Sequence, residues 1–259
     1  MALEALSLAS GSSGNAILVK DDTTAILIDA GIGIRKLTAA LRYRGVDPSE
    51  LSAILITHEH SDHITGAVRT AHRYGVPLVA NAPTLQAIRH SENVPTQVMD
   101  VGECIAFGGM QVRSFRVSHD AACPVGYTIC GCKSTITSVT DTGMLLPEIQ
   151  EEAANADLLI LESNYDEEML IEGPYPYFLK YRIKSENGHL SNDAAAGLII
   201  DLAESGRTPS VWLAHLSKTN NSPSIALATA QHLLWAYSGE HLNISVALRD
   251  IPSLHWIGN

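Results

Sequence analysis

Four potential metal ligands are packed into the segment ILITHEHSDHITG, residues 54–66: His58, His60, Asp62 and His63. Imidazole and carboxylate groups are costly to gather in one place of a fold unless a cation binds them. His58 and His60 are two residues apart, so on an extended segment their side chains point to the same side. Asp62 and His63 lie past an expected turn and can face back from another direction. The segment could therefore ligate two metals, with one pair of side chains for each.

Similar polar residues follow apolar, strand-like runs farther along the chain. They are His119, Asp141, Glu162 and His215. Because ligands in layered α/β folds bind in the loops beyond strand ends, these residues and His58 are expected to form one site. A set of His and carboxylate ligands with one open position is typical of hydrolytic zinc sites. Asp141 is the natural bridge between two metals, and His215 completes the second.

Strands and helices that would position these residues alternate along the chain. Strands are expected at 4–10, 15–21, 24–31 and 51–58, helices at 34–45, 64–75 and 83–91, a strand-rich zone at 97–141, and strand–helix alternation from 146 onward. The pattern predicts a mixed α/β protein with two strand-rich zones, each followed by helices. A sandwich of two sheets between helices satisfies it. The GIG at 31–33 lacks the third glycine of a dinucleotide-binding loop.

The composition excludes several classes of protein. Apolar residues make up 46% and charged residues 17% of the 259 residues, which excludes a disordered chain. The net charge of −11 argues against a basic surface for holding nucleic acid, although bound divalent cations would supply positive charge for a phosphodiester. No apolar run approaches the roughly 20 residues of a membrane span. With no evident secretory signal and only four cysteines, we expect a cytoplasmic protein without a membrane partner.

The ordered motifs resemble one known family. THEHSDH resembles the H-x-H-x-D-H signature of the metallo-β-lactamase fold superfamily, and IDAG with Asp29 upstream, then His119, Asp141 and His215 downstream, keep its order. The segments LASGSSGN, ESNYDEEML, GPYPYFLKYRIKSENGHLSN and HLSKTNNSP are similar to the YycJ/WalJ branch. That branch is similar to ribonuclease Z and is associated with exonuclease activity on DNA.

The resemblance implies a fold and a ligand set. The fold would be a four-layer αββα sandwich, two mixed sheets between helices, in a single domain over residues 1–259 with a dinuclear site at one edge. The first metal would take His58, His60, His119 and Asp141, and the second would take Asp62, His63, Asp141 and His215. The two divalent ions would be Zn²⁺ or Mn²⁺, with Fe²⁺ also open. Many β-lactamases have a cysteine among their ligands where Asp141 stands, so antibiotic hydrolysis is not expected.

The expected function is that of a dinuclear metal hydrolase, a phosphodiesterase acting as a 5′→3′ exodeoxyribonuclease on DNA. A metal-bound hydroxide would attack phosphorus, and Asp62 could accept a proton from the nucleophilic water. His189 could protonate the leaving oxygen or contact the scissile phosphate; its alternative role is loop packing before a helix. Two other functions stay open: hydrolysis of a small thioester or cyclic phosphodiester, and a non-catalytic metal-binding partner protein. The sequence also leaves open the polarity of the exonuclease, the choice between DNA and RNA, and the oligomeric state.

Residues around the ligands are candidates for supporting roles. Asp29 and Thr57 are expected to orient the ligand loop by hydrogen bonds instead of binding metal. Possible substrate contacts are Ser12 and Asn15 in SGSSGN, and Ser217 and Asn220 after His215.

The segment FLKYRIKSENGH places Lys180 and Arg182 among aromatic residues. Such interleaving could track a nucleic-acid strand by phosphate contact and base stacking. An exposed amphipathic helix would have the same pattern, so both interpretations stay open.

Overall fold

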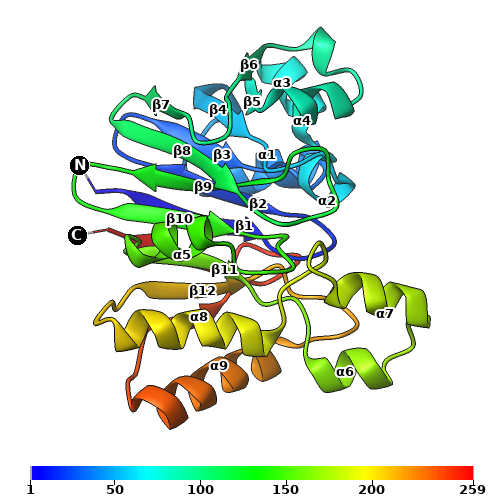
Figure 1. Ribbon diagram of the computed structural model, residues 1–259. Helices are drawn as coiled ribbons and strands as arrows, with labels where there is room; N and C mark the ends of the chain where they lie inside the picture. The colour runs from blue at the N-terminus through cyan, green and yellow to red at the C-terminus, as the bar shows by residue number, and fades with distance from the viewer. Residues whose placement is uncertain (1, 259) are drawn as a thin grey trace.

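Two mixed β-sheets packed face to face form the centre of the protein, and helices cover the outer face of each (Figure 1). This is a computed structural model, and it describes residues 2–258. The four layers confirm the predicted αββα sandwich. No helix within residues 2–258 is both long and apolar enough to cross a bilayer.

Each sheet contains seven strands and combines antiparallel with parallel pairing. The first sheet has the spatial order β14 (His255–Ile257), β1 (Glu4–Ala9), β2 (Ala16–Lys20), β3 (Ala25–Ile28), β4 (Leu51–Leu55), β5 (Leu78–Ala80) and β6 (Thr96–Val98). The second has the order β13 (Ile244–Val246), β12 (Ser210–Ala214), β11 (Leu158–Glu162), β10 (Thr135–Val139), β9 (Val125–Cys130), β8 (Met110–Arg116) and β7 (Cys104–Phe107). Strands β3 to β6 run parallel to one another in the first sheet, as do β10 to β13 in the second.

Helices cover the outer faces. The first sheet is covered by α1 (Ile34–Tyr43), α2 (Ser61–Ile64), α3 (Ala67–Tyr74) and α4 (Ala82–Ala87), and the second by α5 (Pro147–Ala154), α8 (Asn192–Glu204) and α9 (Pro223–Ser238). Short 3₁₀ helices occur at Pro48–Glu50 and Ser91–Asn93. A pair of helices, α6 (Glu167–Glu172) and α7 (Tyr177–Lys184), projects from one side (Figure 1).

Alternation along the strands explains the three large clusters of buried side chains. In β3, Ile26 and Ile28 face the second sheet, whereas Leu27 faces the helices of its own side. Tyr127 of β9 is fully buried between the sheets, and its hydroxyl donates to the carbonyl of Ile56 at 2.8 Å. The inter-sheet core therefore fixes how the two sheets, and the loops at their edges, lie relative to each other.

Some elements differ from the sequence prediction. The helix expected at 64–75 begins only at Ala67, as α3, and the short helix α2 before it was not predicted. Gly66 separates the two helices, because it donates its N–H to the carbonyl of Ala30 at 2.7 Å and packs against the carbonyl of Ile32. The helix expected at 83–91 already ends at Ala87. The prediction did not include α6, nor the three-residue strands β13 and β14.

Candidate metal centre

Polar residues from both sheets meet at one edge of the sandwich. β4 leads into the segment from Thr57 to His63, β8 into His119, β10 into Asp141 and β12 into His215, while Glu162 is the last residue of β11. The parallel strands β4, β10, β11 and β12 all contribute their carboxyl ends, which is where α/β sheets bind ligands. The structure therefore brings together side chains from five separate segments of the chain.

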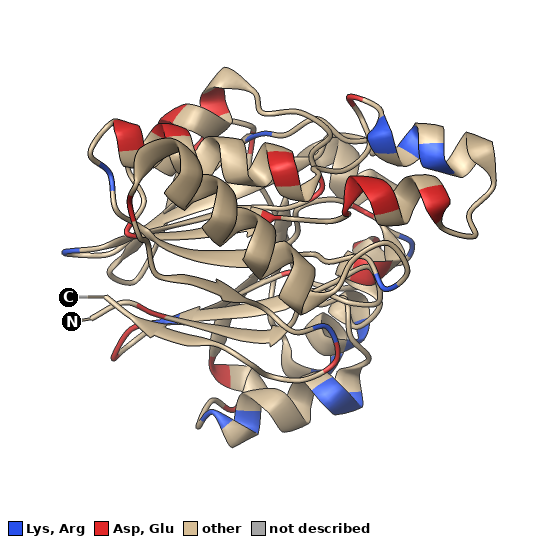
Figure 2. Ribbon diagram, turned by 90° about the horizontal axis from the view of Figure 1, so that it is seen from below, with Lys and Arg blue, Asp and Glu red and all other residues tan. Residues whose placement is uncertain are grey.

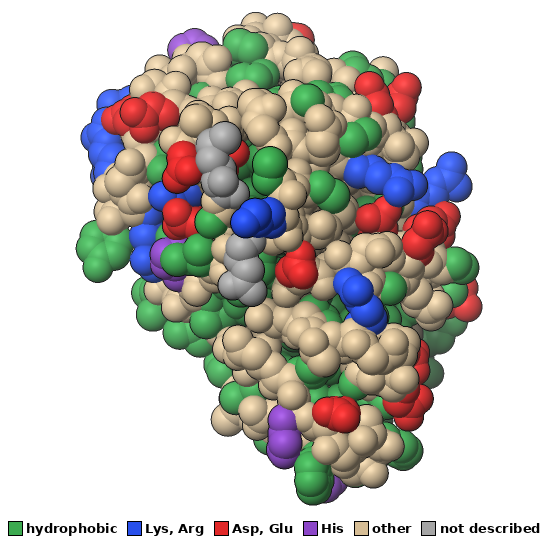
Figure 3. Space-filling model, turned by 90° about the vertical axis from the view of Figure 1, so that its left-hand side faces the viewer, with side chains coloured by type: hydrophobic (Ala, Val, Ile, Leu, Met, Phe, Trp, Pro, Cys, Tyr) green, Lys and Arg blue, Asp and Glu red, His purple; other side chains and the backbone are tan. Residues whose placement is uncertain are grey.

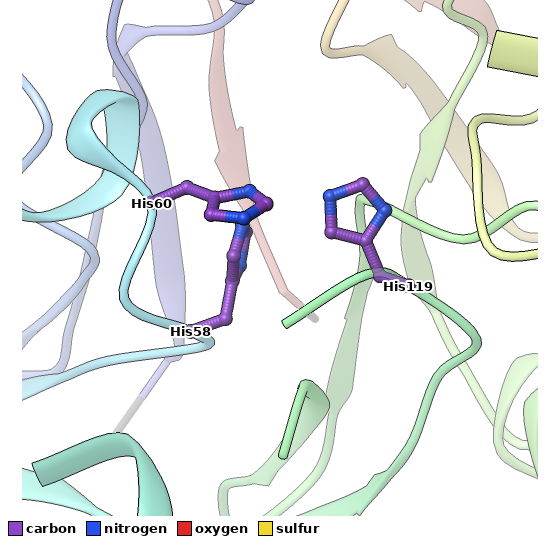
Figure 4. Close-up of side chains that lie close together, drawn as sticks. All are labelled: His58, His60 and His119. Atoms are coloured by element: carbon purple, nitrogen blue, oxygen red, sulfur yellow. The ribbon is translucent and has the colours of Figure 1, made fainter. Parts of the chain in front are cut away.

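The first group consists of His58, His60 and His119, which converge from two sides (Figure 4). One nitrogen of each ring lies within 4.8 Å of the others. Nε2 of His58 is buried and has no hydrogen-bond partner anywhere in residues 2–258. Nδ1 of His119 donates to the carbonyl of Gly188 at 2.8 Å, which leaves the lone pair on Nε2. Unpaired imidazole nitrogens that face one another are suited to a cation.

The second group consists of Asp62, His63 and His215. Oδ2 of Asp62 lies 3.5 Å from Nε2 of His63 and 3.3 Å from Nε2 of His215. Nδ1 of His63 donates to Oδ2 of Asp29 at 2.7 Å, and this contact directs Nε2 of the ring to the centre.

Asp141 lies between the two groups. Its Oδ1 is 3.5 Å from Nε2 of His119 and 3.6 Å from Nδ1 of His215. Its Oδ2 is 3.1 Å from Nε2 of His63, yet it makes no hydrogen bond of good geometry with any described residue. A buried carboxylate that reaches both groups in this way is suited to bridge two cations.

Glu162 lies in the centre, as its position at a strand end predicted, but the sequence analysis did not include it among the ligands or the orienting residues. The residue is fully buried, and its Oε1 accepts from Nδ1 of His189 at 2.8 Å and from Nδ1 of His215 at 2.9 Å. Its Oε2 accepts the backbone N–H of Thr142 at 2.8 Å. Glu162, His189, His215 and Asp141 also form a group that could hold a cation. The carboxylate orients both rings.

Buried charges perturb the titration of the centre. Burial opposes protonation of His215, but Asp141, a hydrogen bond to Asp62, and Glu162 outweigh it and raise its pKa to about 10. Burial also opposes ionisation of Asp62, but hydrogen bonds from His215 and His63 hold its pKa well below its ordinary value. Burial, together with the charge of His63, lowers the pKa of His58 well below its ordinary value. In the metal-free chain, ionised carboxylates thus face protonated His215, and divalent cations can replace such protons.

The backbone is strained at three of these positions. Asp29, Asp141 and His215 have φ angles of 58°, 57° and 56°. This left-handed region is tolerated by aspartate and is less favourable for histidine. Strain of this kind persists only where the surrounding structure enforces it, and it is concentrated at functional sites.

The two residues expected to orient the ligand loop are hydrogen-bonded to it. Oδ1 of Asp29 accepts the N–H of Thr57 at 2.9 Å, and the Thr57 hydroxyl donates to Oδ2 of Asp29 at 2.9 Å. The same hydroxyl lies 3.1 Å from Nδ1 of His58 and 3.2 Å from Nδ1 of His63. These contacts fix two imidazoles at once.

Residues proposed to contact substrate near the ligands lie in different surroundings. Ser12 is exposed, whereas Asn15 is buried, with its Nδ2 3.1 Å from Nε2 of His63. The Ser217 hydroxyl accepts the backbone N–H of Asn220 at 3.1 Å. The Asn220 side chain is buried with no hydrogen-bond partner among the described residues. Of these residues, only Ser12 is exposed at the surface.

The two basic residues of α7 that were expected to contact substrate, Lys180 and Arg182, form hydrogen bonds within the protein. Nζ of Lys180 donates to the carbonyl of Ile171 at 2.6 Å, and Nε of Arg182 donates to Oδ2 of Asp120 at 2.6 Å. The structure confirms a helix here, but it pairs these cations with neighbouring groups.

Comparison with known proteins identifies the family. A family model described as the beta-lactamase superfamily domain matches residues 24–215, which include every candidate metal ligand. The chain belongs to the beta-lactamase superfamily.

Three members of this superfamily illustrate the similarity. Exodeoxyribonuclease WalJ of Streptococcus pneumoniae is 40% identical over 229 residues, which cover 86% of this chain and 84% of that protein. Exodeoxyribonuclease YycJ of Bacillus anthracis is 38% identical over 231 residues, which cover 88% and 87%. The crystal structure of the metallo-beta-lactamase fold protein YhfI from Bacillus subtilis has a TM-score of 0.75 at 18% identity and covers 100% of both chains. The resemblance stated from the motifs is confirmed.

Proposed function

We propose that this chain is a dinuclear-metal phosphodiesterase that acts as a 5′→3′ exodeoxyribonuclease, with residues 1–259 as a single catalytic domain. The observation that carries the proposal is the position of Asp141, whose two carboxylate oxygens face both groups of histidines. A carboxylate in this position could be shared by two cations, and a pair of cations is suited to phosphodiester hydrolysis.

The proposed ligands follow from the two groups. His58, His60, His119 and Asp141 would hold the first cation, and Asp62, His63, Asp141 and His215 the second. The unpaired Nε2 of His58 and Oδ2 of Asp141 support this assignment, because buried polar atoms without partners are rare. When bound, the cations would lower the pKa of water toward about 7 and neutralise charge on the phosphoryl group. Nitrogen and carboxylate ligands suit Zn²⁺ or Mn²⁺, and Fe²⁺ as well.

Two residues of the chain would move protons. Asp62 is ionised and can accept a proton from the nucleophilic water, although its hydrogen bonds to His63 and His215 keep it a weak base until cations displace their protons. His189 donates Nδ1–H to Glu162, so that its Nε2 can carry a proton for the leaving oxygen. The Glu162 carboxylate fixes the orientation of the His189 ring, because it accepts the hydrogen bond from Nδ1.

The substrate assignment is drawn from the relatives. Exodeoxyribonucleases that are 38–40% identical over most of the chain support a DNA substrate. The net charge of −11 means that the cations would provide most of the local attraction for phosphates. We propose a cytoplasmic location for such an enzyme, since its substrate is found there.

The test uses metal-loaded protein with 5′-labelled and 3′-labelled strands of DNA and of RNA. We expect stepwise degradation of DNA from the 5′ end, and its loss in Asp141→Asn, which keeps the shape of the side chain but removes its charge. If no strand is cut while bis(p-nitrophenyl) phosphate or a small thioester is, the chain is a small-substrate hydrolase. If metal binds and nothing is cut, it is a metal-binding partner protein.

A further inference from the structure

The helix pair α6–α7 forms a small unit of its own beside the metal centre. Leu170 of α6 and Ile183 of α7 are buried against Tyr165, in a cluster separate from the three large ones. Several contacts tie this unit to the rest of the protein. Asp166 donates its backbone N–H to the carbonyl of Asn220, the Tyr175 hydroxyl donates to Thr219, and Arg182 pairs with Asp120. The pair is therefore held in a defined position.

Three strongly exposed aromatic rings lie close together on α7. Tyr177, Phe178 and Tyr181 are 83%, 73% and 70% exposed, and Ile171 of α6 beside them is 60% exposed. The chain has only three phenylalanines and eight tyrosines in all, so this concentration on two turns of one helix is notable. Exposed apolar surface of this kind marks a binding site.

Two of these rings, those of Tyr177 and Tyr181, line a hollow beside the helix pair. The hollow has a volume of about 810 Å³ and is also lined by Ile171, by Lys180 and Lys184, and by residues 185–187. The next residues along the chain contact the candidate ligands: Oδ1 of Asn187 accepts from the Ser118 hydroxyl at 3.0 Å, and Gly188 accepts from Nδ1 of His119 at 2.8 Å. The segment 185–188 is therefore a wall shared by the hollow and the metal centre.

The basic side chains of α7 bind to neighbouring groups of the protein. Lys180 donates to the carbonyl of Ile171, Arg182 pairs with Asp120, and Lys184 pairs with Glu167 of α6. Figure 2 shows the basic positions of α7 lying next to the acidic ones of α6. On the side of the molecule away from this pair, acidic and basic side chains also lie close to one another (Figure 3). What α7 presents to a ligand is mainly aromatic.

We propose that Tyr177, Phe178 and Tyr181 are a stacking platform for the bases of a single DNA strand whose terminal phosphodiester lies in the metal centre. The inference rests on the proposed function and adds to it the form of the substrate and the place where it is held. Every base has an aromatic face, so stacking holds a strand without regard to sequence. The shared wall at 185–188 makes this surface continuous with the site of hydrolysis, which favours the substrate itself over another occupant.

The test compares a triple variant, Tyr177→Ala with Phe178→Ala and Tyr181→Ala, with a control variant, Tyr43→Ala with Tyr237→Ala. The control removes rings that are 80% and 71% exposed on α1 and α9. Both are assayed as full-length, metal-loaded protein on a 20-nucleotide single strand and on bis(p-nitrophenyl) phosphate. We expect kcat/KM on the strand to fall at least about 10-fold in the triple variant alone, because stacking on several rings is lost. Hydrolysis of the small substrate is expected to stay unchanged, which also shows that the variant folds.

A second measurement compares the wild type and the triple variant on the same strand and on a strand of the same length that is abasic except at its 5′ terminal nucleotide. If the rings stack on bases, kcat/KM of the wild type is expected to fall on the abasic strand to the value of the triple variant. The triple variant is expected to cut both strands equally. Equal rates of the wild type on both strands, or an unchanged triple variant, would overturn the platform while leaving the exonuclease intact. A wild type that cuts no DNA at all would instead overturn the proposed function. Conversion of a dimer to a monomer by the triple variant, with unchanged strand kinetics, would assign the surface to a second copy of the chain and overturn the platform.

Discussion

Replacing Gly31 by alanine is expected to displace the ligand loop without replacing any ligand side chain. A Cβ at this position would lie 1.6 Å from the backbone oxygen of Asp62 and 2.7 Å from the backbone nitrogen of Asn15. Because a carbon–oxygen contact needs at least about 3.2 Å, the Asp62 segment must move by roughly 1.5 Å. A shift of that size at a catalytic centre costs on the order of 100-fold in rate. Overpacking of this kind also lowers the free energy of unfolding by about 1–3 kcal/mol.

Gly33→Ala is the matched control, two residues away in the same loop. A Cβ there would meet nothing within 4 Å, and the φ angle of −57° is ordinary. Since Gly33 precedes the first residue of α1, we expect a loss of at most about 1 kcal/mol in the free energy of unfolding and unchanged turnover. Bound metal per chain, hydrolysis of bis(p-nitrophenyl) phosphate and urea unfolding are measured for both variants. Normal metal content and turnover in Gly31→Ala, or an equal loss in Gly33→Ala, would refute the reasoning.

Three further perturbations have defined outcomes. Glu162→Gln removes the charge that orients His189 and His215, so metal affinity in a chelator competition is expected to fall about 10- to 100-fold; unchanged affinity would contradict that role. Because the pKa of His215 is raised to about 10, the ring is protonated in the metal-free chain at neutral pH. It must lose that proton before it can bind a cation. The apparent association constant, measured by calorimetry, is therefore expected to rise about tenfold per pH unit between pH 7 and 9 for this proton, and a flat profile would count against it. Tyr127→Phe leaves the carbonyl of Ile56 unpaired in the core, so urea unfolding should show a loss of about 1–2 kcal/mol with normal turnover, whereas equal stability would show the bond to be dispensable.

Much of the fold could be predicted because the strands leading to the centre are strongly apolar. The runs that end in His58, Asp141 and His215 are buried along nearly their whole length, and their patterns are visible in the sequence. The helix α6 and the strands β13 and β14 were missed because they have six, three and three residues. Elements this short are stabilised by tertiary contacts and carry little periodic signal of their own.

The role of Glu162 could not be derived from the sequence. Its partners His189 and His215 are 27 and 53 residues away, and only the packing of β11 between β10 and β12 brings the three together. The left-handed backbone at Asp29 and Asp141 was equally hidden, because aspartate is also common in ordinary turns. The pairing of Lys180 and Arg182 depends on α6 and on Asp120, neither of which the local pattern indicates.

The division of the candidate ligands between the two sheets has a consequence for coupling within the molecule. His58, His60, Asp62 and His63 follow a strand of one sheet, whereas His119, Asp141 and His215 follow strands of the other. Neither sheet provides a whole ligand set. Cations bound at the centre would therefore link the two sheets at the edge where the ligands lie. Occupancy of the centre would then report on how closely the sheets are docked. A substitution in the core between the two sheets, far from any ligand, is therefore expected to weaken cation binding. Removal of the cations by a chelator is expected to speed amide hydrogen exchange in the strands that face each other across this core.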